Sequence, residues 1–156
     1  MALREILNFG DEALRKKCRP VTNFDERLGA LLDDLAETLL ASDGVGLAAP
    51  QIGILRRVAV VNVRDERGTI ELVNPEIVEA EGAQTGNEGC LSAPNEFSEV
   101  ERPLKVTVRA FDRRGNEFTI TGKELCARAF CHEIDHLDGI LFIDHVKKVL
   151  PPRQDI

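Results

Sequence analysis

The stretch KELCARAFCHEIDHLDG, Lys123–Gly139, decides the fold because it predicts the helix against which the strands of this chain pack. Apolar residues recur along it at helical spacing, and Gly139 is a natural helix C-cap. Residues four apart on a helix lie about 40° apart around the axis and about 6 Å apart along it. His132 and His136 can therefore direct ring nitrogens to one metal ion.

Strand patterns precede this helix. Apolar and polar residues alternate through Leu104–Thr121, on both sides of the turn DRRGN, and this predicts a β-hairpin. Buried strands are expected at Arg57–Val63 and Ile70–Val78, the second interrupted near Asn74 and Pro75. Most of the middle of the chain is therefore expected to form antiparallel sheet.

The N-terminal third predicts a helix followed by a loop. A leucine stripe runs through Asn23–Ser42, and Asn23 followed by Glu26 resembles a capping box. The segment DGVGLAAPQIG, Asp43–Gly53, holds three glycines and a proline and fits neither helix nor strand. Together the elements predict one α+β domain over residues 1–156, mostly antiparallel sheet packed against the last helix, with residues 148–156 as a loose tail.

Charge and composition exclude several classes of protein. The 156 residues carry a formal net charge of −7, which disfavours direct nucleic-acid or anionic-membrane binding because such surfaces concentrate Lys and Arg. The sequence has no apolar run of membrane-spanning length and no signal-peptide pattern, so a cytoplasmic protein is expected. The four cysteines lack the spacing of a disulfide framework and are expected to be thiols or ligands.

The histidine pair is an incomplete metal site. Glu133 lies about 100° around the helix from His132 and can reach water near an ion without being a ligand, which is the geometry of a hydrolytic metal helix. The same pattern also arises by coincidence on a capped helix with two hydrogen-bonded histidines. Downstream, the HExxHxxGxxH pattern of one metalloprotease class fails at Phe142, and no glutamate follows Glu133. Asp144 and His145 remain as downstream candidates, just past the helix cap.

Among the cysteines, Cys90 is the candidate third ligand. It stands in EGCLS, Glu88–Ser92, in an expected loop with acidic and polar neighbours. One thiolate and two imidazoles suit Zn²⁺ or Fe²⁺ and leave one position open for water. Cys131 should face away from the ion, because adjacent helical residues diverge by about 100°, and Cys18 and Cys126 are expected to be structural.

Three segments together resemble those of the peptide deformylases: GVGLAAPQIG at Gly44–Gly53, EGCLS at Glu88–Ser92 and HEIDHLDG at His132–Gly139. Weaker similarity reaches DEALRKKCRPV near the N-terminus, so the resemblance covers nearly the whole chain. It implies an α+β fold of mostly antiparallel sheets around a central metal-binding helix. It also implies a hydrolase that removes the N-formyl group from the formylmethionine of nascent polypeptides and releases formate.

The resemblance further implies roles for individual residues. Cys90, His132 and His136 would bind one divalent metal ion, Fe²⁺ in cells, exchangeable for Zn²⁺, Ni²⁺ or Co²⁺. Glu133 would act as general base and then as general acid. The groups that would stabilise the oxyanion are Gln51 and the backbone N–H of Leu91, and those that would contact the peptide or its methionine are Gly44, Val45, Gly46, Gly89, Phe97, Leu125, Ala129 and His132.

Departures from the family pattern affect the expected partners. Phe97 stands where relatives often carry Arg or Tyr at the pocket mouth, so the preferred peptide stays open. Arg102 matches an arginine that pairs with Glu88 in relatives, and an exposed ion pair of this kind is expected to add little stability. Some relatives end in a long basic helix that docks on the ribosome, whereas this sequence stops at Ile156, so at most transient ribosome contact is expected.

Two alternatives stay open. The first is a metallopeptidase of the HExxH type that cuts internal peptide bonds, and the missing downstream ligands count against it. The second is a non-catalytic metal-binding protein. Glu133 and Gln51 count against this second alternative, because a protein that only holds a metal needs neither.

Overall fold

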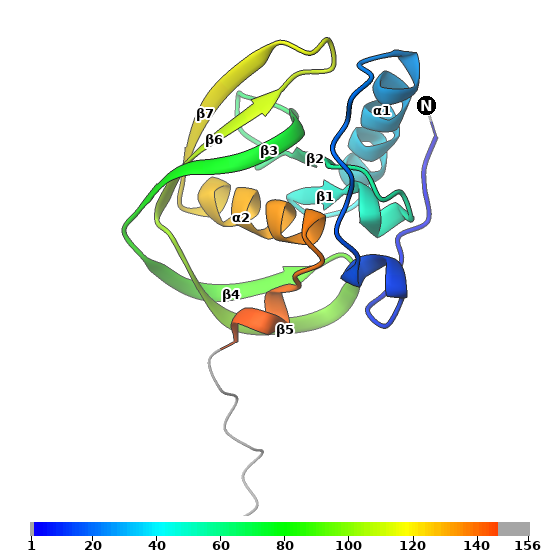
Figure 1. The fold of residues 1–156 in the computed structure, drawn as a ribbon. Helices are drawn as coiled ribbons and strands as arrows, with labels where there is room; N and C mark the ends of the chain where they lie inside the picture. Colours follow the sequence, from blue (N-terminus) through cyan, green and yellow to red (C-terminus); the bar gives the residue numbers. More distant parts are fainter. Residues whose placement is uncertain (1, 147–156) are drawn as a thin grey trace, which may run out of the picture.

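Two antiparallel sheets enclose one helix in the computed structural model, which describes residues 2–146 (Figure 1). In chain order the elements are η1 (Glu12–Arg15), α1 (Glu26–Leu40), β1 (Gly46–Ala48), η2 (Ala49–Ile52), β2 (Val58–Val61), β3 (Ile70–Glu81), β4 (Gln84–Cys90), β5 (Ala93–Arg102), β6 (Lys105–Phe111), β7 (Glu117–Lys123), α2 (Leu125–Leu137) and η3 (Phe142–His145). The predicted α+β class is confirmed. The expected loose tail, residues 148–156, lies outside the described residues.

The sheets differ in size. The larger has the strand order β1-β2-β3-β6-β7, and each neighbouring pair in it is antiparallel. β4 and β5 form a separate two-stranded antiparallel sheet. In Figure 1, α2 lies between the five-stranded sheet and the β4–β5 pair. The central helix implied by the sequence is therefore α2.

α2 is buried on almost all sides. Every residue in Cys126–Leu137 is buried except Asp135. Phe130 is fully buried and belongs to the same core cluster as Val106 and Val108, which lie on one face of β6. Because a polar group buried without a partner is costly, the buried polar side chains of α2 need partners, either protein groups or a bound ligand.

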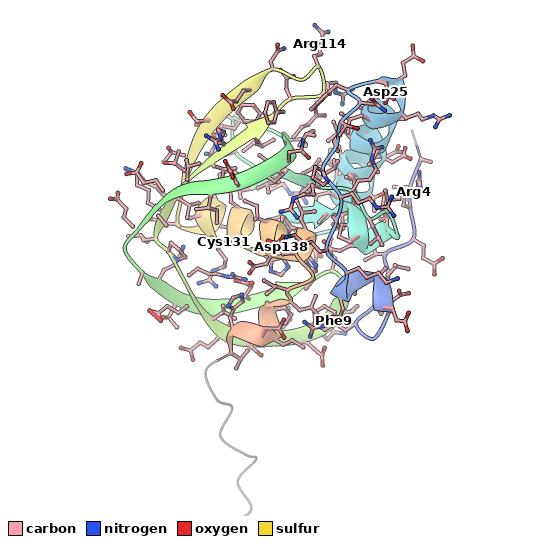
Figure 2. All side chains as sticks on the ribbon, viewed as in Figure 1. Arg4, Phe9, Asp25, Arg114, Cys131 and Asp138 are labelled. Atoms are coloured by element: carbon pink, nitrogen blue, oxygen red, sulfur yellow. The ribbon has the colours of Figure 1, made fainter. Side chains whose placement is uncertain are left out.

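α1 packs its leucine stripe against β1 and β2. The helix starts after Asp25, whose carboxylate accepts a hydrogen bond from the Leu28 backbone N–H at 3.1 Å. The predicted capping box at Asn23 is therefore wrong, since Asp25 satisfies the first turn two residues later. Figure 2 shows Arg4 beside α1, where its guanidinium pairs with Asp34 at 2.9 Å and holds the N-terminal segment on the helix.

The predicted strands and hairpin are present, including the interruption in the second strand. β3 has a register shift between Val73 and Glu76, and Asn74 within it has a positive φ of 50°. The Asn74 side chain accepts a hydrogen bond from the Val21 N–H and donates one to the Val21 carbonyl, at 2.7 and 2.9 Å. These bonds compensate for the ladder contacts that the irregularity removes.

Two segments differ from the prediction. Asp43–Gly53, expected as a loop, contains β1 and η2. β1 is three residues long and buried throughout, so it has no alternation from which to predict a strand. Gln84–Arg102 forms the β4–β5 hairpin, and Cys90 ends β4 instead of lying in a loop. Among residues 2–146, no helix is long and apolar enough to cross a membrane.

Candidate metal centre

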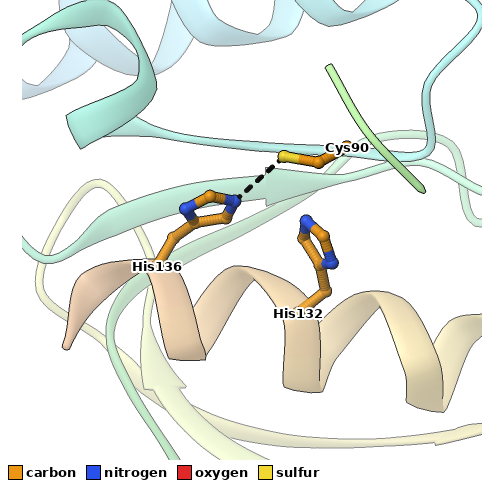
Figure 3. Close-up of side chains that lie close together, drawn as sticks. All are labelled: Cys90, His132 and His136. Carbon is orange, nitrogen blue, oxygen red and sulfur yellow. Dashed lines mark hydrogen bonds between the residues drawn. The ribbon is translucent and has the colours of Figure 1, made fainter. Parts of the chain in front are cut away.

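Three donor side chains meet where the end of β4 approaches α2 (Figure 3). Cys90 Sγ lies 3.3 Å from His136 Nε2. The ring centroids of His132 and His136 are 4.9 Å apart. Taking one donor atom from each of the three residues, all lie within 4.8 Å of one another. The structure thus brings together the three side chains predicted as ligands.

The surroundings of these donors fit a divalent cation. One sulfur and two imidazole nitrogens form a donor set that suits Zn²⁺ or Fe²⁺. His132 Nδ1 lies 2.6 Å from Glu88 Oε2, which leaves Nε2 free to face an ion; a carboxylate behind a metal-binding histidine is common. Glu133 Oε1 is buried without a hydrogen-bond partner among residues 2–146. Such an atom is unusual in a folded protein and fits a carboxylate directed at a reaction site.

Glu88 is the centre of a buried ion cluster behind His132. Its carboxylate accepts hydrogen bonds from Arg102 Nε and Nη2, at 3.0 and 2.6 Å, and from Arg128 Nη1 at 2.8 Å. Glu88 and Arg102 are only 4% and 5% exposed, so the expectation of an exposed pair is wrong. Burial opposes ionisation, but hydrogen bonds from His132 and Arg102 outweigh it and hold the pKa of Glu88 well below its usual range. The charged carboxylate therefore fixes the orientation of the His132 ring.

The two imidazoles differ in their titration. Burial alone lowers the pKa of His132, but Glu133, Cys90 and Glu88 outweigh burial and raise this pKa to about 10. Burial and the neighbouring His132 charge lower the pKa of His136 well below its usual value. A cation that binds both rings must displace the His132 proton, so metal binding at neutral pH releases a proton.

Glu133 lies in the same buried region as the donors. Burial raises the pKa of Glu133 to about 7, and the positive charge on His132 only partly opposes this shift. β1 passes so close that a Cβ added at Gly46 would overlap the Glu133 carboxylate. The carboxylate therefore faces the backbone of β1, and a side chain at position 46 would displace it.

Gln51, in η2, is buried beside Cys90. Its side-chain oxygen accepts a hydrogen bond from the Ala48 N–H at 2.9 Å. Its Nε2 donates to Ser92 Oγ at 3.1 Å and lies 3.5 Å from Cys90 Sγ. η2 thus turns the amide nitrogen toward the candidate metal centre. The Ser92 contact was not predicted, because a serine next to EGCL carries no pattern of its own.

A cavity of about 400 Å³ lies beside the donors. It is lined by Cys90, Leu91, His132 and Glu133, and by every residue predicted to contact substrate: Gly44, Val45, Gly46, Gly89, Phe97, Leu125 and Ala129. Phe97 is 68% exposed and covers Gly89, where an added Cβ would lie 2.6 Å from the aromatic ring. Gln51 and His136 do not line the cavity and adjoin the centre through Cys90.

The other candidate ligands contact protein groups instead. Asp144 pairs with Arg15 at 2.6 Å, and His145 Nε2 lies 2.8 Å from Asp135 Oδ2. Cys131, labelled on α2 in Figure 2, belongs to the hydrophobic cluster of α2 and the large sheet. Neither downstream residue, nor Cys131, joins the candidate metal cluster among the described residues.

Cys90 should be the cysteine that alkylating reagents modify in the folded protein, and bound metal should protect it. Cys18, Cys126 and Cys131 are buried, and burial raises the pKa of Cys18 and Cys131 to about 11, whereas Cys90 is only partly buried. Iodoacetamide labelling at about pH 8, read by peptide mass spectrometry, should mark Cys90 alone in metal-free protein and far less of it after Zn²⁺ loading. Equal labelling of Cys18 or Cys131 would contradict this expectation.

Comparisons with known proteins decide the family. The polypeptide deformylase family model matches residues 3–151. A peptide deformylase from Caldicellulosiruptor bescii is 57% identical over 146 residues, which cover 94% of this chain and 87% of that protein. The chain belongs to the peptide deformylase family. Peptide deformylase 1 of Bacillus subtilis is 52% identical over 148 residues, 95% of this chain and 92% of that protein.

Solved peptide deformylase structures have the same fold. The crystal structure of peptide deformylase from Thermotoga maritima matches with a TM-score of 0.90 and 41% identity, over 94% of this chain and 99% of that one. The enzyme from Legionella pneumophila matches with a TM-score of 0.90 and 47% identity, over 94% and 88% of the two chains. As a peptide deformylase, this chain is a hydrolase that removes the N-formyl group from nascent polypeptides, and the family implies a divalent metal.

Proposed function

We propose that this peptide deformylase hydrolyses the formyl amide of N-formylmethionyl peptides at the centre formed by Cys90, His132 and His136. The observation that carries this proposal is the convergence of one sulfur and two imidazoles within 4.8 Å, beside Glu133 and a cavity. A divalent cation held there supplies a Lewis acid that polarises a carbonyl and lowers the pKa of water toward 7. The donor set suits Fe²⁺ and Zn²⁺ alike, and the family resemblance favours Fe²⁺ as the ion in cells, with Zn²⁺, Ni²⁺ or Co²⁺ able to replace it.

Glu133 serves as the proton carrier in this proposal. As general base it takes a proton from the attacking water, and as general acid it gives that proton to the leaving amine nitrogen when the C–N bond breaks. The products are formate and a peptide with a free methionyl amine. Burial raises the pKa of Glu133 to about 7, and a bound cation lowers it again, so the carboxylate is ionised when it takes the proton from water and is a strong enough acid to give that proton to the amine.

Gln51 and the backbone N–H of Leu91 stabilise the oxyanion in this proposal. As the formyl carbon becomes tetrahedral, its oxygen gains negative charge, and each preorganised donor typically contributes about 3 kcal/mol to the transition state. The bond between Gln51 and the Ala48 N–H supports this role, since it holds the amide nitrogen beside Cys90. Leu91 follows Cys90 directly and lines the cavity.

The substrate peptide lies along the backbone of β1 and the end of β4 in this proposal. The glycines at positions 44 and 46 support this role, because a side chain at either position would displace a residue that lines the cavity. A Cβ at Gly44 would come within 2.8 Å of the Leu91 side chain, and one at Gly46 would overlap Glu133. The methionine side chain enters the part of the cavity lined by Val45, Leu125, Ala129 and His132, and Gly89 and Phe97 contact the residues that follow it.

The substrate also indicates partners and place of action. Nascent chains would reach the enzyme in the cytoplasm, with at most transient contact with the ribosome. A net charge of −7 supports the absence of direct nucleic-acid binding. The family match over residues 3–151 supports one catalytic domain for the whole chain.

Cys90→Ser tests the centre directly. A hydroxyl is a poor replacement for a thiolate with borderline ions, so metal content after anaerobic purification should fall at least about tenfold, and formate release from a formyl-Met peptide should fall with it. Elemental analysis and a formate assay measure the two quantities. Cys131→Ser, a buried cysteine on α2 outside the donor cluster, should keep the metal. Wild-type metal content in Cys90→Ser would remove Cys90 from the centre.

A further inference from the structure

A continuous chain of hydrogen bonds leads from His132 to the surface. His132 Nδ1 contacts Glu88 Oε2 at 2.6 Å, and Glu88 accepts two hydrogen bonds from Arg102. Arg102 Nη1 donates to Asp135 Oδ2 at 2.8 Å. The same Oδ2 atom lies 2.8 Å from His145 Nε2, and since a carboxylate only accepts, His145 is the donor. His145 ends this chain, with its side chain 38% exposed.

We propose that His145 is a positioning residue for His132 and acts through Asp135, Arg102 and Glu88. The proposal rests on the proposed role of His132 as a metal ligand. His145 itself donates to no candidate ligand and does not line the cavity, so any effect that it has on His132 is indirect.

The shared oxygen of Asp135 explains how the effect would arise. Arg102 and His145 both donate to Oδ2 of Asp135. His145 therefore offsets part of the negative charge that attracts Arg102. Without His145, Asp135 would attract Arg102 more strongly and, at 21% exposure, would also be free to turn toward solvent. Either change draws the guanidinium away from the geometry in which it holds both oxygens of Glu88. The donor on Asp135 therefore helps to keep Arg102 in place.

Burial allows a shift of Arg102 to affect the candidate metal centre. Glu88, Arg102 and His132 are all buried, so solvent does not readily replace a weakened contact, and hydrogen bonds in such networks depend on one another. Glu88 Oε2 accepts from Arg102 Nη2 and also faces His132 Nδ1. A shift of Arg102 therefore moves the same oxygen that orients the His132 ring.

A second set of contacts connects η3, which contains His145, to the candidate metal centre, and the experiment must distinguish it from the hydrogen-bonded chain. Phe142, in η3, stacks on the His132 ring with centroids 6.1 Å apart. The Arg15–Asp144 ion pair holds the same turn in place. Arg15→Gln removes that pair and leaves His145 untouched. It is therefore the matched control for a general loosening of η3.

Co²⁺ binding tests the proposal, because the visible spectrum of bound Co²⁺ reports ligand geometry. Metal-free wild type, His145→Leu, His145→Gln and Arg15→Gln are titrated anaerobically with Co²⁺. His145→Leu should weaken Co²⁺ affinity about fivefold, less than the 10–100-fold typical of a group that touches the ligand itself, and should shift the absorption bands. In His145→Gln, the amide can donate to Asp135, so affinity and spectrum should return toward wild type. Arg15→Gln should match wild type in both.

Activity and a coupled variant complete the test. The kcat of Co²⁺-loaded His145→Leu should fall while KM stays unchanged, because His145 does not reach the substrate cavity. In an Asp135→Asn background the same substitution should have little further effect, since the contact is already changed. If the leucine variant does not fold, His145→Ala gives the same comparison.

Three results would overturn this role: wild-type affinity and spectrum in His145→Leu, no recovery in His145→Gln, or an equal loss in Arg15→Gln. Failure of the wild type itself to bind Co²⁺ would overturn the proposed centre together with the role of His145. The two failures are therefore distinguishable.

Discussion

Glu133→Gln should give a protein that binds metal and has lost most of its activity. The amide keeps the size of the carboxylate but cannot take a proton, and general acid–base catalysis typically contributes about 10²–10⁴-fold. The kcat for deformylation should fall by about this factor while metal content stays at the wild-type level. Formate release and elemental analysis of the same preparation measure both quantities. Glu124→Gln, an exposed glutamate just before α2, is the matched control and should keep full activity.

The pH profile provides a second check on Glu133. A base must be ionised to accept a proton, so the wild-type rate should rise with pH on the acid side and level off above the pKa. Burial raises the pKa of Glu133 to about 7, and a bound cation lowers it again by favouring the charged form. The acid limb should therefore lie at or below about pH 7 and be missing from the residual activity of Glu133→Gln. The same limb in the variant would show that another group is the base.

Glu88→Gln should cause a large loss of stability and of metal affinity. It removes the negative charge that lies between the guanidinium groups of Arg102 and Arg128. Breaking a buried ion pair from one side typically costs 3–5 kcal/mol, and we expect about 3 kcal/mol because Asp135 still pairs with Arg102. Metal affinity should fall about 10–100-fold, since Glu88 orients His132. Denaturant unfolding of the metal-free protein and metal titration measure the two effects.

An exposed ion pair gives the contrast. Glu81 pairs with Lys105 at 3.3 Å on the surface, so Glu81→Gln should change the free energy of unfolding by less than about 1 kcal/mol. A cost for Glu88→Gln as small as that for Glu81→Gln would mean that the buried cluster does not stabilise the fold.

The stability difference between wild type and Glu88→Gln should depend on pH. The pKa of Glu88 is lower in the folded protein than in the unfolded chain. Its contribution to stability is therefore fully present above about pH 4, near the usual carboxyl pKa, and is lost as the pH falls below that value. The two proteins should converge in stability in acid. A difference that widened on acidification would have the opposite sign from this mechanism.

Local patterns were sufficient to predict much of the fold. α2 and the β6–β7 hairpin follow directly from apolar periodicity and turn residues, because each buries one regular face. The β4–β5 hairpin could not be predicted in this way. Its strands carry polar residues on both faces, since this small sheet covers α2 with few apolar side chains. β1 is too short to show any period.

The candidate site, like the fold, could be predicted only in part from the sequence. The donors Cys90, His132 and His136 could be proposed from residue type and spacing. The burial of Glu88 with Arg102 could not be predicted, because it depends on Arg128, which α2 supplies 40 residues further along the chain. Sequence order does not show which distant charges meet in the interior, and for this reason the pair was expected on the surface.

The position of Cys90 at the end of β4, opposite two histidines of α2, has a mechanical consequence. An ion held by all three side chains fastens the small sheet to the central helix and closes the stretch of chain between residues 90 and 132 into a ring. The cofactor would then act as a cross-link as well as a reagent. Oxidation of one sulfur atom would remove both roles at once, so this cross-link and turnover would be lost together.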